Sequence, residues 1–331
     1  MRLIVGIDEA GYGPNLGPLV IAASVWRSTK RFDVSQGLAP FAPEFHAAPW
    51  KPGSDHVPFG DSKKIYKRSL GIAGLEIAMR FFEHAIGRSN PSLLDLNYLA
   101  PLDYLRVESK EWYAQKWTVE ENKSSCNLGT DLAESAQSKL ESLGLHLIGI
   151  ELRILDEKYF NEGIQRLGNK AELLAETSLG LVWRQLQSYT LKDSFDSVEV
   201  YCDRQGGRKH YAALLAASYD LHHPSEPVPL FHAIDESPTL SRYRSEYCER
   251  PLTIQFQVDG DSLFPSAVAS LAAKWAREVL MARLNKFWQS TVQRPIKPTA
   301  GYAVDAARFA DQIMPYATQL GLDRDHWWRM K

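Results

Sequence analysis

The sequence predicts an α/β fold, a mixed β-sheet flanked by helices. Two apolar, strand-like segments, residues 3–7 and 19–26, follow each other across a turn rich in Gly and Pro, which indicates a hairpin. The strand-like segments later in the chain are separated by helical ones. Strands that pair locally at first and are later separated by helices are typical of a mixed sheet.

Composition places the chain among globular proteins. Of its 331 residues, 44% are hydrophobic and 24% are charged, which excludes the fibrous and the wholly disordered classes. Lys and Arg number 38 against 40 acidic residues, a formal net charge of −2. This balance excludes a uniformly basic nucleic-acid coat but allows a local basic groove. The length predicts about two domains, or one domain enlarged by insertions.

The cysteines and the apolar runs indicate a reducing compartment. Cys126, Cys202 and Cys248 form no CxxC pair and no zinc spacing, so we expect free thiols buried as small hydrophobic groups. No signal peptide precedes the first strand, and no apolar run approaches the roughly 18 residues of a membrane span. We expect a soluble, cytoplasmic protein that does not bind membranes.

In the first half of the chain, the pattern predicts a buried strand, an irregular insertion, one long helix and several short helices. Residues 3–7 are continuously apolar, as a strand covered on both faces requires. Residues 27–58 are rich in Pro, Phe and Ala without a regular period, so we expect an irregular insertion there. A helical pattern starts at Asp61-Ser62 and continues from about residue 64 to 87. Residues 89–145 predict short helices and loops, one of the helices near 131–143.

The second half alternates strands and helices. We expect strands over 146–154, 195–203 and 252–258, and helices over 171–191, 263–288 and 304–320. The alternation within 195–203 places Val198, Val200 and Cys202 on one face of that strand. Several alanines between residues 267 and 276 predict that their helix packs closely on the sheet.

Acidic residues follow three of the predicted strands. Asp8 and Glu9 end the first strand, Asp203 ends the strand over 195–203, and Asp261 follows the strand over 252–258. Asp259 is the weaker candidate because it points to the opposite face if the strand continues. The carboxyl ends of strands are the edge at which open α/β sheets bind their ligands.

If these acids converge, their repulsion requires a compensating charge. Two unit charges about 4 Å apart repel by roughly 4 kcal/mol at an effective dielectric constant near 20. A group of carboxylates therefore binds a divalent cation or takes up protons. Oxygen ligands without His or Cys favour Mg²⁺ or Mn²⁺ over Zn²⁺, and such a site suits phosphoryl transfer.

At these residues the chain resembles ribonuclease HII, which cuts RNA strands paired to DNA or embedded in it. Residues 6–18, GIDEAGYGPNLGP, are similar to the family's G-x-D-E-A-G-R-G-P-x-x-G-P. Residues 61–64 resemble its D-S-K-K segment, and Asp203 falls at its strand-end aspartate. Residues 260–265 and 269–278 resemble its G-D-S-L-x-P and A-S-x-x-A-K-x-x-R-D blocks, and Gly301-Tyr302 resembles its G-Y. The order is the same throughout.

The resemblance implies an RNA–DNA hybrid endoribonuclease. Its metal ligands, for Mg²⁺ or Mn²⁺, would be Asp8, Glu9, Asp203 and Asp261. Its substrate-binding residues would be Gly11, Tyr12, Gly13, Lys63, Lys64 and Tyr302. The first three would hold the scissile phosphate region, the lysines would meet backbone phosphates, and the tyrosine ring would pack on the sugar at the RNA–DNA junction. The substrate would be an RNA–DNA hybrid or a ribonucleotide-containing duplex, with no obligate protein partner.

The resemblance also implies a ribonuclease H-like mixed sheet with a helical C-terminal cap. We expect a catalytic domain over 1–290, with insertions near 27–58, 90–145 and 219–250, and a helical segment over 291–331. Tyr12 stands where the family has Arg, which removes a charged, bidentate phosphate donor. This departure favours the alternative function, a non-catalytic or differently specific nucleic-acid-binding relative.

Two other motifs indicate different chemistry. Gly11, Gly13 and Gly17 after a strand are similar to a dinucleotide-binding turn, but Pro18 and a strand-like run follow where a helix is required. Residues 260–263 match the GDSL esterase signature, and Asp323 with His326 would complete a triad with Ser262. That triad leaves too little chain for a catalytic domain of its class and does not explain the N-terminal acids.

Overall fold

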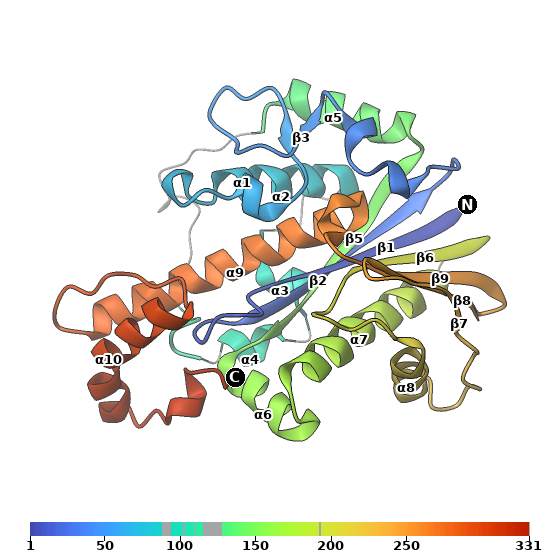
Figure 1. The fold of residues 1–331 in the computed structure, drawn as a ribbon. Coiled ribbons are helices and arrows are strands. Elements are labelled where there is room, and N and C mark those ends of the chain that lie inside the picture. Colours follow the sequence, from blue (N-terminus) through green and yellow to red (C-terminus); the bar gives the residue numbers. More distant parts are fainter. Residues whose placement is uncertain (88–93, 102, 109, 115–127, 192, 331) are drawn as a thin grey trace.

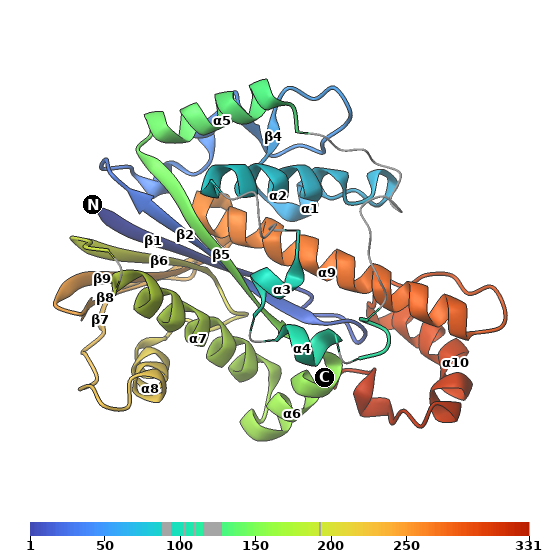
Figure 2. The same ribbon diagram turned by 180° about the vertical axis from the view of Figure 1, so that it is seen from behind.

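The computed structural model describes residues 1–331 except 88–93, 102, 109, 115–127, 192 and 331. A seven-stranded mixed sheet runs through the described part of the chain between two layers of helices (Figures 1 and 2). The predicted α/β fold, a mixed sheet flanked by helices, is confirmed. No helix in the described ranges combines the length and the apolar character needed to cross a bilayer.

The strands of the main sheet are β1 (Arg2–Ala10), β2 (Leu19–Ser28), β5 (Leu145–Leu155), β6 (Ser197–Asp203), β7 (His232–Glu236), β8 (Leu240–Tyr247) and β9 (Arg250–Gln257). A separate small sheet consists of β3 (Phe45–His46) and β4 (Val57–Pro58).

The α-helices are α1 (Ser62–Ile65), α2 (Ala73–Ile86), α3 (Leu96–Leu99), α4 (Tyr104–Glu108), α5 (Thr130–Ser142), α6 (Glu157–Leu167), α7 (Lys170–Thr190), α8 (Ala212–His222), α9 (Phe264–Thr291) and α10 (Ala303–Gln319). The 3₁₀ helices are η1 (Val34–Gln36), η2 (Ala39–Phe41), η3 (Arg68–Leu70), η5 (Gly260–Ser262) and η6 (Arg324–His326).

The strand order of the main sheet is β5-β2-β1-β6-β9-β8-β7. β1 and β2 form the predicted antiparallel hairpin, while β1, β6 and β9 are parallel neighbours. β8 and β7 extend the sheet as an antiparallel hairpin beyond β9. Three parallel strands therefore end at the same edge, and these are the three strands that the acidic residues follow.

Each face of the sheet has its own apolar core. On one face, Ile4 and its neighbours pack against α9, α2 and α5, and on the other face Leu3 and Val5 pack against α6, α7 and α8. The predicted alternation in β6 is confirmed, because Val198, Val200 and Cys202 all lie in the second core. Residues on the opposite side of β6 therefore share a face with α9.

The start of helix α9 packs directly against the backbone of β1. A Cβ atom added to Gly6 would lie 2.1 Å from the carbonyl carbon of Pro265. The Ser24 hydroxyl donates to the Pro265 carbonyl at 2.7 Å, and the Ser266 hydroxyl donates to the Tyr201 carbonyl at 3.1 Å. The predicted close packing of the alanines is confirmed, since all five are fully buried, at positions 267, 269, 272, 273 and 276.

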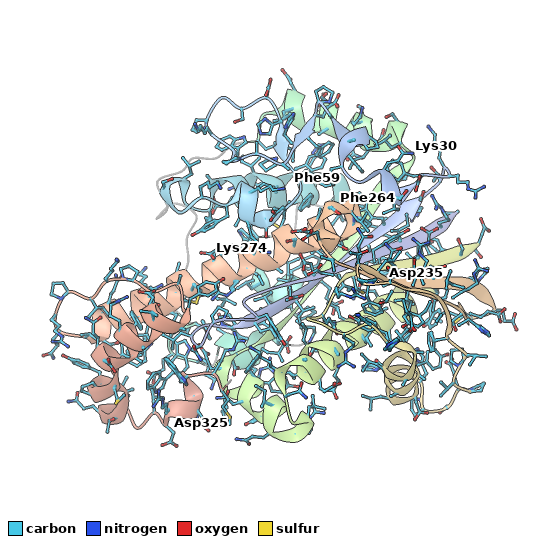
Figure 3. All side chains as sticks on the ribbon, in the orientation of Figure 1. Lys30, Phe59, Asp235, Phe264, Lys274 and Asp325 are labelled. Carbon is cyan, nitrogen blue, oxygen red and sulfur yellow. The ribbon has the colours of Figure 1, made fainter. Side chains whose placement is uncertain are left out.

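The insertion over 27–58 is held to the start of α9 by aromatic side chains. The ring of Phe41 lies 5.0 Å from that of Phe59 and 5.4 Å from that of Phe264, centroid to centroid. Figure 3 shows Phe59 beside the start of α9, where Phe264 lies. The segment is irregular, as expected, but it has a buried aromatic core of its own.

Three expectations differ from the structure. The helix expected over 64–87 is two helices, because Tyr66 leaves α1 in an extended conformation and Gly71, at φ 63°, turns the chain before α2. The expected insertion near 219–250 contains all of β7 and β8, which belong to the main sheet. Cys248 is exposed rather than buried, since it lies in the left-handed turn after β8; Cys126 lies outside the described residues.

The contact between Gly6 and α9 generates the first prediction. Gly6→Ala pushes β1 and α9 apart, because the new methyl group meets backbone atoms that cannot rotate away. We expect the free energy of unfolding to fall by about 3 kcal/mol, as for severe overpacking. Gly207→Ala is the control, because a Cβ there meets nothing within 4 Å. Equal stability of the two variants in denaturant titrations would contradict this account of the β1–α9 contact.

Candidate functional site

The carboxyl ends of β1, β6 and β9 bring the predicted acids together. Ile7 of β1 pairs with Cys202 of β6, so Asp8 and Asp203 lie one residue further along on adjacent strands. Asp203 in turn pairs with Gln257 of β9, and Asp261 lies in η5 directly after that strand. The strands thus arrive in register at one edge.

Asp8, Glu9 and Asp203 form a compact group of carboxylates. One side-chain oxygen from each lies within 4.8 Å of the other two. Neighbours in a strand ordinarily point to opposite faces, but here both acids at the end of β1 reach the same group. Asp261 lies outside this group but lines the same cavity, as does Asp259.

The cavity has a volume of about 280 Å³ and is lined from six segments of the chain. Its lining residues are Asp8, Glu9, Ala10, Gly11, Tyr12, Asp61, Ser62, Lys63, Asp203, Asp259, Asp261, Ser270, Lys274, Arg277 and Tyr302. Eight of the ten site residues predicted from the sequence are among them. Gly13 and Lys64 are not.

Burial and mutual repulsion hold these acids toward their protonated forms. Burial, followed by the charges of Glu9 and Asp203, raises the pKa of Asp8 well above its ordinary value. Burial and then the Asp203 charge raise the pKa of Glu9 from 4.5 to about 7. The pKa of Asp203 is raised by burial, and that of Asp261 rises to about 6 through burial and then the Asp61 charge. Burial is the largest cause of the shift in all four acids.

Backbone amides fix two of the carboxylates. The Glu9 amide donates to Asp8 Oδ1 at 2.8 Å, and the Gly260 amide donates to Asp203 Oδ1 at 2.9 Å. A Cβ on Gly260 would lie 2.8 Å from the Asp203 Cα atom, so only Gly lets η5 approach β6 this closely. This approach places Asp261 beside the end of β6.

Lys63 is the cation that α1 places in the cavity. The Asp61 side chain caps α1 by accepting from the Lys63 amide at 2.8 Å. Burial opposes its charge, but Asp261, Asp61, Asp8 and Asp203 outweigh this and raise the pKa of Lys63. Lys64 points outward instead: its side chain is 70% exposed and its Nζ lies 4.0 Å from Asp61 Oδ2.

The glycine turn after β1 has one buried and one open end. Gly11 adopts φ 92°, and a Cβ there would lie 2.3 Å from Arg277 Nε. Tyr12 lines the cavity, with Lys170 Nζ 4.9 Å from its ring centroid. Gly13 is exposed, with open space around its Cα atom. Because β2 rather than a helix follows this turn, the dinucleotide-binding interpretation is wrong.

Tyr302 forms the far wall of the cavity. It stands at the N-cap position of α10 and is 55% exposed, so its ring is accessible. The Arg277 guanidinium lies 5.9 Å from the ring centroid. The Gly301 carbonyl accepts from the Asn15 amide at 2.8 Å, which ties the Tyr302 segment to the glycine turn.

Three cavity residues that the sequence analysis did not assign lie on one face of α9. Ser270, Lys274 and Arg277 are spaced by four and three residues, the spacing of neighbours on a helix surface (Figure 3 labels Lys274). All three lie within the block of residues 269–278 on which the resemblance rests, so helical spacing within that block was a usable signal.

Arg329 is a fourth unassigned residue, and no sequence motif indicated it. Its side chain is 1% exposed, and its guanidinium donates to the carbonyls of Gly11 at 2.6 Å and Tyr12 at 3.1 Å. It also lies 3.8 Å from the Phe160 ring centroid. Burial, together with the Arg277 charge, lowers its pKa to about 9. A residue near the end of the sequence thus stabilises the glycine turn through hydrogen bonds to its backbone.

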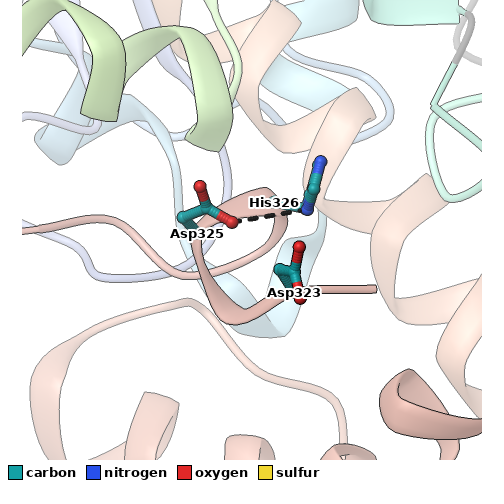
Figure 4. A group of neighbouring side chains, drawn as sticks. All are labelled: Asp323, Asp325 and His326. Carbon is teal, nitrogen blue, oxygen red and sulfur yellow. Dashed lines mark ion pairs between the residues drawn. The ribbon is translucent and has the colours of Figure 1, made fainter. Parts of the chain in front are cut away.

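A second group of possible ligands, Asp323, Asp325 and His326, lies around η6 (Figure 4). Both acids are exposed, and exposed acids often gather without an ion, so we assign this group no metal role. His326 Nδ1 lies 3.4 Å from Asp325 Oδ1, which gives His326 a partner other than the Asp323 of the GDSL triad. Ser262 belongs to η5 at the end of β9, whereas η6 packs on α6.

The chain matches no protein-family model and no curated protein sequence. Among solved structures it is similar to ribonuclease H2 from Pyrococcus horikoshii OT3, with 17% identity and a TM-score of 0.41 over 98% of this chain and 92% of that one. It is similar to RNase HII in the PCNA complex from Archaeoglobus fulgidus, with 14% identity and a TM-score of 0.40, over 99% of this chain and 94% of that one. It is also similar to Bst-RNase HIII in complex with Mn²⁺, with 12% identity and a TM-score of 0.39, over 99% of this chain and 66% of that one.

The raised pKa of Glu9 predicts a pH-dependent stability. Between its ordinary pKa of 4.5 and about 7, the folded protein binds more protons than the unfolded chain, so the free energy of unfolding falls as pH rises through this range. Glu9→Gln removes this loss. In EDTA, we expect the free energy of unfolding of the variant to exceed that of the parent by roughly 3 kcal/mol above pH 7 and to match it near pH 4.5.

Glu162→Gln on the exposed side of α6 is the control for this measurement. Both variants and the parent are unfolded with denaturant at a series of pH values. The difference in free energy of unfolding between Glu162→Gln and the parent should be the same at every pH. A Glu9→Gln difference that does not grow with pH would contradict the raised pKa.

The buried guanidinium of Arg329 generates a further prediction. Arg329→Met leaves the carbonyls of Gly11 and Tyr12 without their donor, so we expect the free energy of unfolding to fall by about 3 kcal/mol. Arg294→Met, at an exposed position, is the matched control and should change stability by less than about 0.5 kcal/mol. Similar chemical denaturation midpoints for both variants would show that Arg329 does not hold the turn.

Proposed function

We propose that the protein is a divalent-metal-dependent endonuclease of the ribonuclease HII type. It hydrolyses the RNA strand of RNA–DNA hybrids or cuts at ribonucleotides embedded in duplex DNA. The observation that carries this proposal is the group of three carboxylates at the ends of parallel strands, with Asp8 buried and Glu9 and Asp203 half-buried. The ordered family motifs of the sequence lie on the walls of the same cavity.

The donor set fits Mg²⁺ or Mn²⁺. The three acids offer only oxygen ligands, the donor type that these ions prefer. Asp261, which lines the same cavity, is the fourth proposed ligand. Bound there, the ions would supply the charge that activates water and stabilises the leaving oxygen.

The chain's own residues position the substrate around these acids. Lys63 and Arg277 place positive charge where the scissile phosphate becomes more negative. The backbone at Gly11 and Tyr12, held by Arg329, borders the phosphate, and the exposed Tyr302 ring packs on a sugar. Water oxygen bonds to phosphorus as the bond to the 3′ oxygen breaks, which leaves a 3′-hydroxyl and a 5′-phosphate.

We further propose a catalytic domain over 1–290 capped by the helical segment 291–331. Val292, Phe309 and Ile313 of this segment share the apolar core beneath α9, so the cap is packed against the domain. Gly13 and Lys64 stay in the proposal as outer contacts of the substrate, beyond the cavity. We place the protein in the cytoplasm, without an obligate protein partner.

A cleavage assay with four substrates tests the function. An RNA–DNA hybrid, a duplex with one ribonucleotide, a DNA duplex and an RNA duplex are incubated with Mg²⁺ or Mn²⁺. We expect cleavage of the first two only. Asp203→Asn should lower that cleavage more than ~100-fold with the fold retained, because it removes one ligand charge without changing shape. Asp323→Asn, in the exposed group around η6, is the control and should cleave normally.

Two outcomes would contradict the proposal. Undiminished cleavage by Asp203→Asn would refute the metal site. A folded protein that cleaves none of the substrates, yet binds duplexes in a salt-dependent way, would favour the non-catalytic alternative that Tyr12 suggests.

A further inference from the structure

One half of the sheet face that contains Asp203 is not covered by an α-helix in the described residues. Helix α9 covers this face over β1 and β2, but Figures 1 and 2 show β9, β8 and β7 extending beyond it. Alternation along β6 puts Glu199 and Tyr201 on the same face as Asp203. The open surface and the catalytic acids therefore belong to one continuous side of the sheet.

A groove of about 910 Å³ lies on this open surface. Strands β6, β9 and β8 form its floor, and residues 31–35 of the N-terminal insertion form one wall. This volume lies within the range of about 300–1,000 Å³ typical of pockets for small ligands. A few nucleotides of a single strand fit such a space, whereas a duplex does not.

Four arginines line the groove, and three of them have free donors. Arg2 is engaged, since its guanidinium donates to Glu199 at 2.8 Å. Arg242 uses only Nε, which donates to Gln255 at 3.0 Å. Arg31 and Arg244 are exposed and have no hydrogen-bond or ion-pair partner in the part of the chain that the structure describes.

The two acids of the groove do not cancel this charge. Glu199 is occupied by Arg2 and by the Tyr201 hydroxyl, which donates to it at 2.8 Å. Asp33 accepts from the Ser35 amide and hydroxyl at 3.0 and 2.7 Å, as the cap of η1. Three arginines therefore face one acid that is already hydrogen-bonded, which favours an anionic ligand.

The groove begins where the catalytic site ends. Gln257 lines the groove and pairs with Asp203, and Leu263 lines it directly after η5, which contains Asp261. Arg242 and Arg244 pair with Gln255 and Thr253, two and four residues back along β9 from Gln257. At about 3.3 Å per residue, the two arginines lie roughly 7 and 13 Å along the strand from that end.

We propose that this arginine groove, with Arg31, Arg242 and Arg244 as its phosphate contacts, binds an unpaired single strand that continues from the strand cut at the catalytic site. The proposal rests on the proposed function. Cationic grooves with aromatic rings are the usual means of binding single strands, because guanidinium groups follow the backbone while rings stack on bases. The half-buried ring of Tyr201 in the floor is such a stacking surface.

The test compares substrates with and without an unpaired tail. A blunt RNA–DNA hybrid and two versions with a ten-nucleotide tail, 5′ or 3′ on the RNA strand, are titrated by fluorescence anisotropy in EDTA. We expect one tail to tighten Kd about 10-fold. In the Arg31→Glu/Arg244→Glu variant this gain in affinity disappears. The plot of log K against log salt for that tailed substrate becomes less steep by about 1.4, because two phosphate contacts are lost.

The control is Lys51→Glu/Arg294→Glu, which makes the same change in net charge at exposed positions outside the groove. It should keep the full gain from the tail. The Arg31→Glu/Arg244→Glu variant should bind and cleave the blunt hybrid like the parent, because neither residue lines the catalytic cavity.

The outcomes separate this inference from the proposed function. The proposal for the groove would be wrong if neither tail increased affinity. It would also be wrong if the double variant kept the increase. Equal weakening of blunt and tailed substrates would also overturn it, by showing that the arginines contact the duplex. A gain that depends on the arginines in a protein that cleaves nothing would support the groove while the proposed nuclease activity fails.

Discussion

The contact between Gly6 and the first turn of α9 determines how the rest of the molecule is arranged. Because the helix lies against the backbone of β1, its residues Ser270 and Arg277 reach the carboxyl end of the strand, where Asp8 lies. The same helix begins directly after η5, so the approach that places Arg277 also places Asp261. Side chains larger than Ala on this face of α9 would separate the two elements, which explains the run of buried alanines.

Parallel strands that end together impose an electrostatic problem on this site. The polypeptide places one carboxylate oxygen from each of Asp8, Glu9 and Asp203 within 4.8 Å of the other two, and their removal from water raises their pKa values. The cations nearby have separate places. Lys63 lines the cavity, and Arg329 lies buried under the glycine turn, where it donates to backbone carbonyls.

Helix α9 covers only part of the sheet face that contains Asp203, so this face has two kinds of surface. Over β1 and β2, α9 excludes water and the residues are apolar, whereas over β9 and β8 the residues on the same face are Gln, Thr and Arg. The opposite face of β9 and β8 is buried and mostly apolar, because α7 and α8 and their loops cover it. Asp203 lies at the boundary between the covered and the open half. A cavity lined by acids and a groove lined by arginines therefore meet at the end of one strand.

Local pattern was sufficient to predict most of the elements. The hairpin of β1 and β2, the strands β5, β6 and β9, and the helices α7, α9 and α10 follow from periodicity, and the acids follow from their place after apolar strands. The break between α1 and α2 was missed because Tyr66 carries no breaker signal and a single glycine, Gly71, is tolerated within a helical pattern. The β7–β8 hairpin was missed because charged residues mask its alternation. Local pattern is enough to predict which strands end in acids. The packing of distant segments determines which acids meet, that Lys63 rather than Lys64 lines their cavity, and that Arg329 supports the turn. Those outcomes depend on register and on contacts between residues hundreds of positions apart, which no local pattern encodes.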